Sequence, residues 1–201
     1  MHQSDSVSPQ LTAANRQTLL LIARETIAAH LSAREAKYPP VDQALRRRCG
    51  AFVTLHTQAH GELRLRGCIG YLDDSYELAD TVRRAAEASA FHDGRFSPLT
   101  LVELPVIRIE ISVLSAFHEI DDLMQVRPGV DGLFIRQGTH SGLLLPQVAT
   151  TYGWDRVTLL EQTCMKAGLR PSAYKLADTS IQSFTALVFS EEQSPPEESD
   201  D

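Results

Sequence analysis

Residues 64–70, with the sequence RLRGCIG, combine one thiol with two guanidinium groups. The stretch is typical of a β-strand that ends in a turn, and alternation along a strand places Arg64 and Arg66 on the same face as Cys68. Positive charge beside a thiol favours the nucleophilic thiolate, and it also binds anions. Gly67 and Gly70 allow unusual backbone angles or a close backbone approach. We therefore predict a reactive cysteine or an anion site here, against the structural alternative that a free cysteine simply fills the core.

A second group of chemical side chains follows in the stretch 91–98, FHDGRFSP. His92, Asp93 and Arg95 lie within four positions on a predicted loop, where catalytic groups often collect. The same letters also fit a helix that ends in a turn, so structural and functional interpretations both stay open. Because both stretches lie at the ends of elements, we expect Cys68 and the loop from His92 to Phe96 to line one concavity.

Composition excludes several classes of function. The chain has 201 residues and a net charge of −7, with six acidic residues in positions 191–201. There is no basic surplus that would indicate a nucleic-acid partner. No apolar run reaches membrane-spanning length, and the three cysteines, at positions 49, 68 and 164, form no disulfide framework. We expect a cytoplasmic protein that binds neither nucleic acid nor membrane.

The predicted elements indicate an α+β fold with a mostly antiparallel sheet and flanking helices. A helix that starts at Ser8-Pro9 is followed by a hairpin over 50–55 and 62–69, in which Leu63, Leu65 and Ile69 face away from the cysteine. A helix capped by Asp74 and Glu77, which ends at the stretch 91–98, should pack tightly on that sheet. It presents Leu78, Val82, Ala85 and Ser89 on one face. Further predictions are a strand over 106–114, a short helix over 121–126, a hairpin over 133–145, a helix ending at Ala167 before Gly168, and one strand over 181–190.

These elements place the domain boundaries. We expect a disordered segment over residues 1–7, one domain over 8–190, and a disordered acidic tail over 191–201. Cys164 shares the apolar face of its helix with Leu160, which favours a place in the core.

Several motifs together resemble the AMMECR1 domain family. They are LRGCIG at 65–70, GAFVTL at 50–55, DGRF at 93–96, IEISVL at 109–114, GLLLPQV at 142–148 and KAGL at 166–169. One departure is Gly94, where many relatives are expected to have proline. The resemblance implies an α+β fold with a larger and a smaller lobe. It also implies a three-part system with a Memo-like protein and a radical S-adenosylmethionine enzyme. S-adenosylmethionine and an iron–sulfur cluster would then belong to a partner, and this chain would need no cofactor of its own.

The candidate site leaves two functions open. In an enzyme, Cys68 would be a nucleophile or acid/base group, activated by Arg66 and His92, and it would be the most reactive of the three thiols. In a substrate-binding or adaptor protein, the same pocket would hold a small molecule or peptide, with Arg66 and Arg95 gripping a carboxylate or phosphate. The substrate-binding candidates are Gly67, Gly70, Asp93, Arg95 and Phe96. A metal site from Cys68, His92 and Asp93 is a weaker third option, and we predict none.

Overall fold

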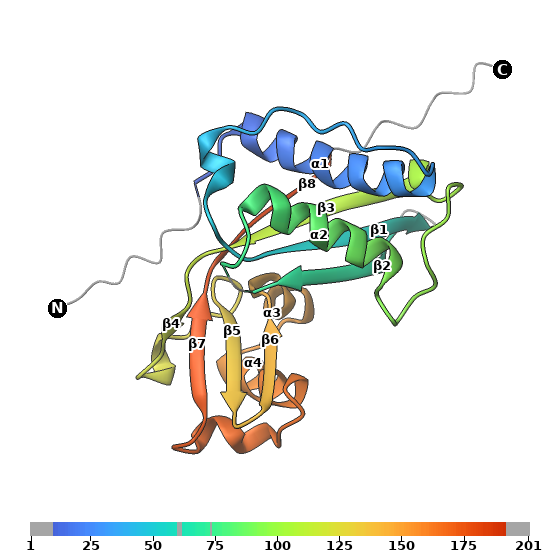
Figure 1. Cartoon of the computed structure of the whole chain (residues 1–201). Helices are drawn as coiled ribbons and strands as arrows, with labels where there is room; N and C mark the ends of the chain where they lie inside the picture. The colour runs from blue at the N-terminus through green and yellow to red at the C-terminus, as the bar shows by residue number, and fades with distance from the viewer. Residues whose placement is uncertain (1–9, 60–61, 73, 192–201) are drawn as a thin grey trace. The chain divides into compact units, whose positions relative to one another are not determined.

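The structure, a computed structural model, describes residues 10–59, 62–72 and 74–191. Within them it contains four α-helices and two four-stranded antiparallel sheets, which confirms the α+β prediction (Figure 1). The chain divides into two compact units. The N-terminal unit is Leu11–Val113 together with the chain from Val188 onward, and the C-terminal unit is Leu114–Leu187.

The sheet of the N-terminal unit has the strand order β2-β1-β3-β8, so β2 is an edge strand. Helices α1 and α2 pack on each other and lie along the same side of this sheet (Figure 1). The elements are α1 Ala13–Leu31, η1 Gln43–Arg46, β1 Ala51–Ala59, β2 Glu62–Tyr71, α2 Leu78–Phe91, η2 Leu104–Val106, β3 Ile107–Leu114 and β8 Ala186–Ser190.

The predicted β1–β2 hairpin is confirmed, but a β-bulge changes which residues share a face. Leu55 lies opposite Gly67, whereas the next residue, His56, lies opposite Leu65, so Arg66 is the extra residue. Directly opposite residues share a face of a sheet, which puts Leu65 on the face of Cys68. Arg64 lies on the other face, opposite Thr57. The predicted faces of Leu63, Leu65 and Arg64 were therefore wrong, because strict alternation fails at the bulge.

The apolar core of the N-terminal unit lies between this sheet and its two helices. Residues 107, 109, 111 and 113 of β3 are all buried apolar residues, as the alternating sequence predicted. Ala51, Val53 and Leu55 of β1 are buried opposite them. The other face of the same strands carries polar residues, among them Thr54 and Glu110, and no helix of this unit covers it.

The two helices of this unit begin differently from the prediction. Thr12 caps α1 in a reciprocal capping box with Asn15, whereas Ser8 lies outside the described residues. At α2 the cap residue is Glu77, which makes no side-chain cap hydrogen bond, so the predicted Asp74 box was wrong. The first N–H group of α2, on Leu78, is instead accepted by the carbonyl of Arg47 at 2.8 Å.

The sheet of the C-terminal unit has the order β4-β7-β5-β6, and helix α4 packs on β5 and β6. Cys164 is fully buried in this unit's core, as predicted. Gly168 adopts φ 74° after the helix, which is the left-handed conformation expected of it. The elements are β4 His118–Glu119, η3 Leu123–Gln125, β5 Gly132–Gln137, β6 His140–Leu144, α3 Pro146–Tyr152, α4 Arg156–Lys166, η4 Pro171–Lys175 and β7 Ser180–Phe184.

The last predicted strand is in fact two strands, β7 and β8, which belong to different sheets. They meet at Thr185, whose N–H is accepted by the Ser115 hydroxyl and whose carbonyl accepts the Ser115 N–H, both at 2.9 Å. These bonds replace ladder pairing at Thr185, so the chain leaves one sheet there and enters the other.

Glu191, predicted to begin the acidic tail, is an ordered part of the N-terminal unit. Its carboxylate accepts a hydrogen bond from Arg24 Nε at 2.6 Å and one from the Ile109 N–H at 3.0 Å. Arg24 also donates to the carbonyls of Leu104 and Ile107. The rest of the predicted tail, 192–201, and the predicted N-terminal segment, 1–7, lie outside the described residues. None of the helices described here has the length and apolar character needed to cross a membrane.

Candidate functional site

Cys68 lies on edge strand β2, directly opposite Thr54 of β1. The Thr54 hydroxyl donates a hydrogen bond to Cys68 Sγ over 3.3 Å, and Cys68 is a free thiol. The thiol thus faces the side of the sheet that α1 and α2 do not cover. We call this side, defined by Cys68, Thr54, His56 and Glu110, the thiol face.

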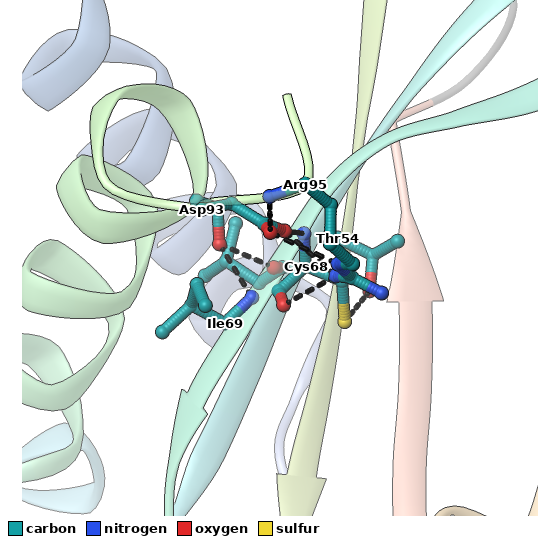
Figure 2. A network of polar contacts seen from close by, with 7 residues as sticks. Thr54, Cys68, Ile69, Asp93 and Arg95 are labelled. Carbon is teal, nitrogen blue, oxygen red and sulfur yellow. Dashed lines mark hydrogen bonds and ion pairs between the residues drawn. The ribbon is translucent and has the colours of Figure 1, made fainter. Parts of the chain in front are cut away.

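Asp93 and Arg95 hold the backbone of Cys68 from the open edge of the sheet (Figure 2). The Cys68 N–H donates to Asp93 Oδ2 at 2.9 Å, and Arg95 Nη2 donates to the Cys68 carbonyl at 3.1 Å. Asp93 and Arg95 are joined to each other by Nε–Oδ1 and Nη2–Oδ2 contacts of 2.9 and 2.7 Å. The predicted proximity of Cys68 and the loop after α2 is therefore confirmed, although no concavity is established. Asp93 and Arg95 thus occupy the N–H and the carbonyl of Cys68, with which a further strand would otherwise pair at this edge.

Ser89 of α2 fixes the same strand from the helix side. Its hydroxyl donates to the Val53 carbonyl at 2.7 Å and accepts the Ile69 N–H at 2.8 Å, so it joins β1 to β2. Gly67 makes this approach possible, because a Cβ at that position would lie 2.2 Å from the Ser89 carbonyl oxygen. The predicted tight packing of α2 on the sheet is confirmed at this contact.

Gly70 also has a packing explanation. A Cβ there would lie 2.3 Å from ring atoms of Phe52, on the neighbouring strand. Neither Gly67 nor Gly70 has positive φ. Close packing thus accounts for both glycines, and their predicted role in substrate binding stays a prediction.

Arg66 is paired with a carboxylate from another part of the chain. Its guanidinium pairs with the carboxylate of Glu103 through Nε–Oε1 and Nη2–Oε2 contacts of 2.7 and 3.3 Å, and its side chain is only 12% exposed. The pair lowers the pKa of Glu103 to about 2. Because the bulge turns Arg66 toward Glu103, its predicted catalytic and anion-gripping roles are not supported.

Phe96 and His92 complete the predicted set. The Phe96 ring lies 5.9 Å from the guanidinium carbon of Arg66 and 5.5 Å from that of Arg95, both within cation–π range. His92 is exposed at the end of α2, where its backbone N–H donates to the Ala88 carbonyl. Among the described residues its side chain makes no hydrogen bond, so the predicted contact of His92 with Cys68 is not found.

The electrostatics of the site favour a protonated thiol. Burial raises the pKa of Cys68, while the Thr54 hydroxyl and the charge of Arg95 act to lower it, and the charges of Asp93 and Glu110 raise it. Burial also raises the pKa of Cys49 and Cys164. Hydrogen bonds from Arg95 hold the pKa of Asp93 well below its usual range, so Asp93 is a carboxylate at neutral pH. The expected depression of the Cys68 pKa was wrong, because desolvation outweighs the nearby cation.

Three residues of the thiol face were missed from the sequence: Thr54, His56 and Glu110. Thr54 lies between Cys68 and Glu110 in one row across β2, β1 and β3. His56 is two residues from Thr54 on the same strand, and burial lowers its pKa. The polar residues that alternate with apolar ones in β1 and β3 were the available signal, but pairing was needed to place them beside Cys68. Over residues 10–59, 62–72 and 74–191, no group of three or more His, Cys, Asp or Glu side chains could hold a metal ion.

A thiol titration tests this description. We expect Cys68 in the native protein to react with iodoacetamide along a pH profile whose midpoint lies above about 8.5. Thr54→Val should move the midpoint higher still, because it removes a donor that stabilises the thiolate. Peptide mapping after limited alkylation separates Cys68 from Cys49 and Cys164. If the alkylation profile of Cys68 instead had its midpoint near about pH 6.5, the hypothesis that Cys68 is an activated nucleophile would be supported.

Fold and site together define a class of protein: an α+β chain with two antiparallel sheets, in which an Asp–Arg pair holds an edge-strand cysteine. A family model described as AMMECR1 matches residues 20–189. The chain therefore belongs to the AMMECR1 family.

Its relatives agree in length and fold. The chain is 39% identical over 182 residues to Protein PH0010 of Pyrococcus horikoshii, covering 87% of this chain and 88% of that protein. It is 40% identical over 184 residues to a protein of Methanothermobacter thermautotrophicus, covering 88% of this chain and 94% of the other. The crystal structure of the uncharacterized protein PH0010 matches with a TM-score of 0.80 and 37% identity, over 87% of this chain and 90% of that one.

Proposed function

We propose that this protein is the substrate-binding component of a modification system that also contains a Memo-like protein and a radical S-adenosylmethionine enzyme, and that its binding surface is the thiol face. Membership of the AMMECR1 family supports the place in such a system. The setting that we propose is the cytoplasm, which suits three unpaired cysteines.

One observation carries the choice of binding over catalysis. The backbone of Cys68 is fixed on both its N–H and its carbonyl, while burial keeps its thiol protonated. A fixed strand with a neutral thiol, a hydroxyl and a carboxylate in one row is suited to hold a polar substrate in a defined orientation. Of the other groups expected to activate the cysteine, Arg66 is paired with Glu103, and the His92 side chain makes no hydrogen bond to Cys68 among the described residues.

In this proposal the partner proteins carry out the radical chemistry of the system. The three cysteines lie before β1, on β2 and on α4, and Cys164 is buried in the core of the C-terminal unit. Such a distribution gives no set of thiolates for an iron–sulfur cluster. In the proposal, S-adenosylmethionine and the cluster therefore belong to the radical enzyme, and this chain presents the substrate to it.

A second candidate is an enzyme with Cys68 as nucleophile. It is favoured by the Thr54 hydroxyl that donates to Sγ, because such a bond stabilises a thiolate once it forms. His56, whose pKa is lowered by burial, would be present on the same face as a neutral base. In this candidate the thiol loses its proton only when substrate is bound.

Reconstitution separates the two candidates. The purified protein is incubated with a cell extract, alone and together with the Memo-like protein and the radical enzyme encoded in the same genome, and products are identified by untargeted mass spectrometry. We expect a product only when all three proteins are present, and a complex of this protein with at least one partner on size-exclusion chromatography. Product from this protein alone would support the enzyme. Neither complex nor any effect of this protein on product would contradict the proposed function.

A further inference from the structure

The strongest cluster of reactive groups not used by the predicted site is the row that continues from Cys68 through Thr54 to Glu110. We propose that Glu110 binds a positively charged group of the substrate, an ammonium or guanidinium, and so places the substrate across the thiol of Cys68. This inference rests on the proposed binding function of the thiol face and adds the charge of what it binds.

The row is fixed by strand pairing. Glu110 of β3 lies opposite Thr54 of the central strand β1, and Thr54 lies opposite Cys68 of β2. Side chains that lie directly opposite each other in antiparallel strands have Cβ atoms about 4.5–5.5 Å apart. A ligand that contacts both the carboxylate and the thiol therefore spans two strand spacings, with the buried residue Thr54 between its two ends. That span fits the end of an amino-acid side chain or a small amine.

The carboxylate of Glu110 is unpaired within the part of the chain that the structure describes. Among the described residues it makes no hydrogen bond and no ion pair, although the residue is partly buried. Its charge acts on two neighbours: it adds to the rise that burial causes in the pKa of Cys68, and it opposes the lowering that burial causes in the pKa of His56. A carboxylate removed from water gains most from a partner that brings both positive charge and hydrogen-bond donors.

Within the part of the chain that the structure describes, no cationic side chain is paired with Glu110. Burial lowers the pKa of His56, which leaves its imidazole neutral at pH 7. Arg108 lies on the same face, opposite His56, and keeps its positive charge, but its guanidinium is held by other acceptors. Its Nε donates to the Glu191 carbonyl and its Nη2 to the Ser190 hydroxyl. Arg95 is paired with Asp93. Among the described residues, no cation contacts the Glu110 carboxylate, which favours a positively charged group at this position over the carboxylate or phosphate that the sequence alone suggested.

Model ligands test the inference on the whole protein. The probes are N-acetyl-lysine amide and N-acetyl-arginine amide, with N-acetyl-norleucine amide as a neutral analogue and N-acetyl-glutamate amide as an anion. Binding is followed by NMR of the protein. We expect a cationic probe to bind at least about tenfold more tightly than norleucine amide and to shift the resonances of Glu110.

Variants link the preference to one residue. Glu110→Gln should weaken binding of the cationic probes about tenfold or more, while Glu62→Gln, on an exposed residue of β2, should leave it unchanged. Glu110→Asp keeps the charge on a shorter side chain, so its affinity for the cationic probes should lie between those of the wild type and Glu110→Gln. This variant gives a second test should Glu110→Gln fold poorly. Equal binding of norleucine amide, preference for the anion, no binding of any cationic probe, or full affinity in Glu110→Gln would each overturn the inference. The proposed function fails separately, in the reconstitution with its partners.

Discussion

Replacing Gly67 by alanine is expected to destabilise the N-terminal unit severely, by about 3 kcal/mol or more. The new Cβ would lie 2.2 Å from the Ser89 carbonyl oxygen, and the atom it meets is helix backbone rather than a flexible side chain. Either α2 or β2 must move, and such a shift weakens the Ser89 hydrogen bonds to Val53 and Ile69. Urea unfolding, followed by circular dichroism, measures the loss.

Gly94→Ala is the matched control. Gly94 lies in the neighbouring loop, and a Cβ there would meet nothing within 4 Å. We expect its unfolding free energy to change by no more than about 0.5 kcal/mol. If Gly67→Ala is as stable as Gly94→Ala, the close approach of α2 to β2 does not exist as described.

Asp93→Asn is expected to cost about 2–3 kcal/mol of stability at pH 7. The Asp93 side chain is only 4% exposed, and it accepts hydrogen bonds from the Cys68 N–H and from both the backbone and the side chain of Arg95. Asparagine keeps the shape but loses the charge and one acceptor. Because the Arg95 side chain is 52% exposed, its guanidinium can be rehydrated, which keeps the cost below that of a fully buried pair.

The pH dependence gives this prediction a second measurement. The pKa of Asp93 is lower in the folded protein than the ~3.9 of an unfolded aspartate, so the folded state gains from its ionisation. That stability is fully present above about pH 4 and is lost as the pH falls through the lower folded pKa. The stability of Asp93→Asn should therefore fall less steeply with acid than that of the wild type. Asp80→Asn, which removes an exposed ion pair with Arg83 on α2, should follow the wild-type curve.

The fold was predictable from the sequence where a local pattern has one solution. The alternation of residues 107–114 predicted β3, and Gly168 predicted the end of α4. The bulge at Arg66 could not be predicted from the sequence, because an extra residue does not change the composition of a strand. It is seen only in the pairing of His56 with Leu65. The split of the last strand was hidden for a similar reason, since it depends on the hydrogen bonds of Thr185 with Ser115, 70 residues away in sequence.

The candidate site was predictable only in part. The sequence brought Cys68 and Asp93 together correctly, because both lie at the ends of elements that pack tightly. It named both arginines, but with the roles of each still to be placed: Arg95, from the loop, reaches the Cys68 backbone, whereas Arg66, near the cysteine in sequence, pairs with Glu103. Thr54 and Glu110 could not be found from spacing, since three strands distant in sequence form their row. Desolvation of the thiol likewise follows from packing and not from composition.

The division of the chain also orders events during synthesis. The N-terminal unit includes the chain from Val188 onward, so the ribosome makes the C-terminal unit before it completes β8. At ~5–20 residues per second, strand β3 waits roughly four to fifteen seconds for its neighbour. During that interval the edge of β3 is unpaired, and Arg24 has not yet met Glu191. During this interval the free edge of β3 can pair with a strand of another chain. Synthesis of β8 and Glu191 covers that edge and ends the exposure.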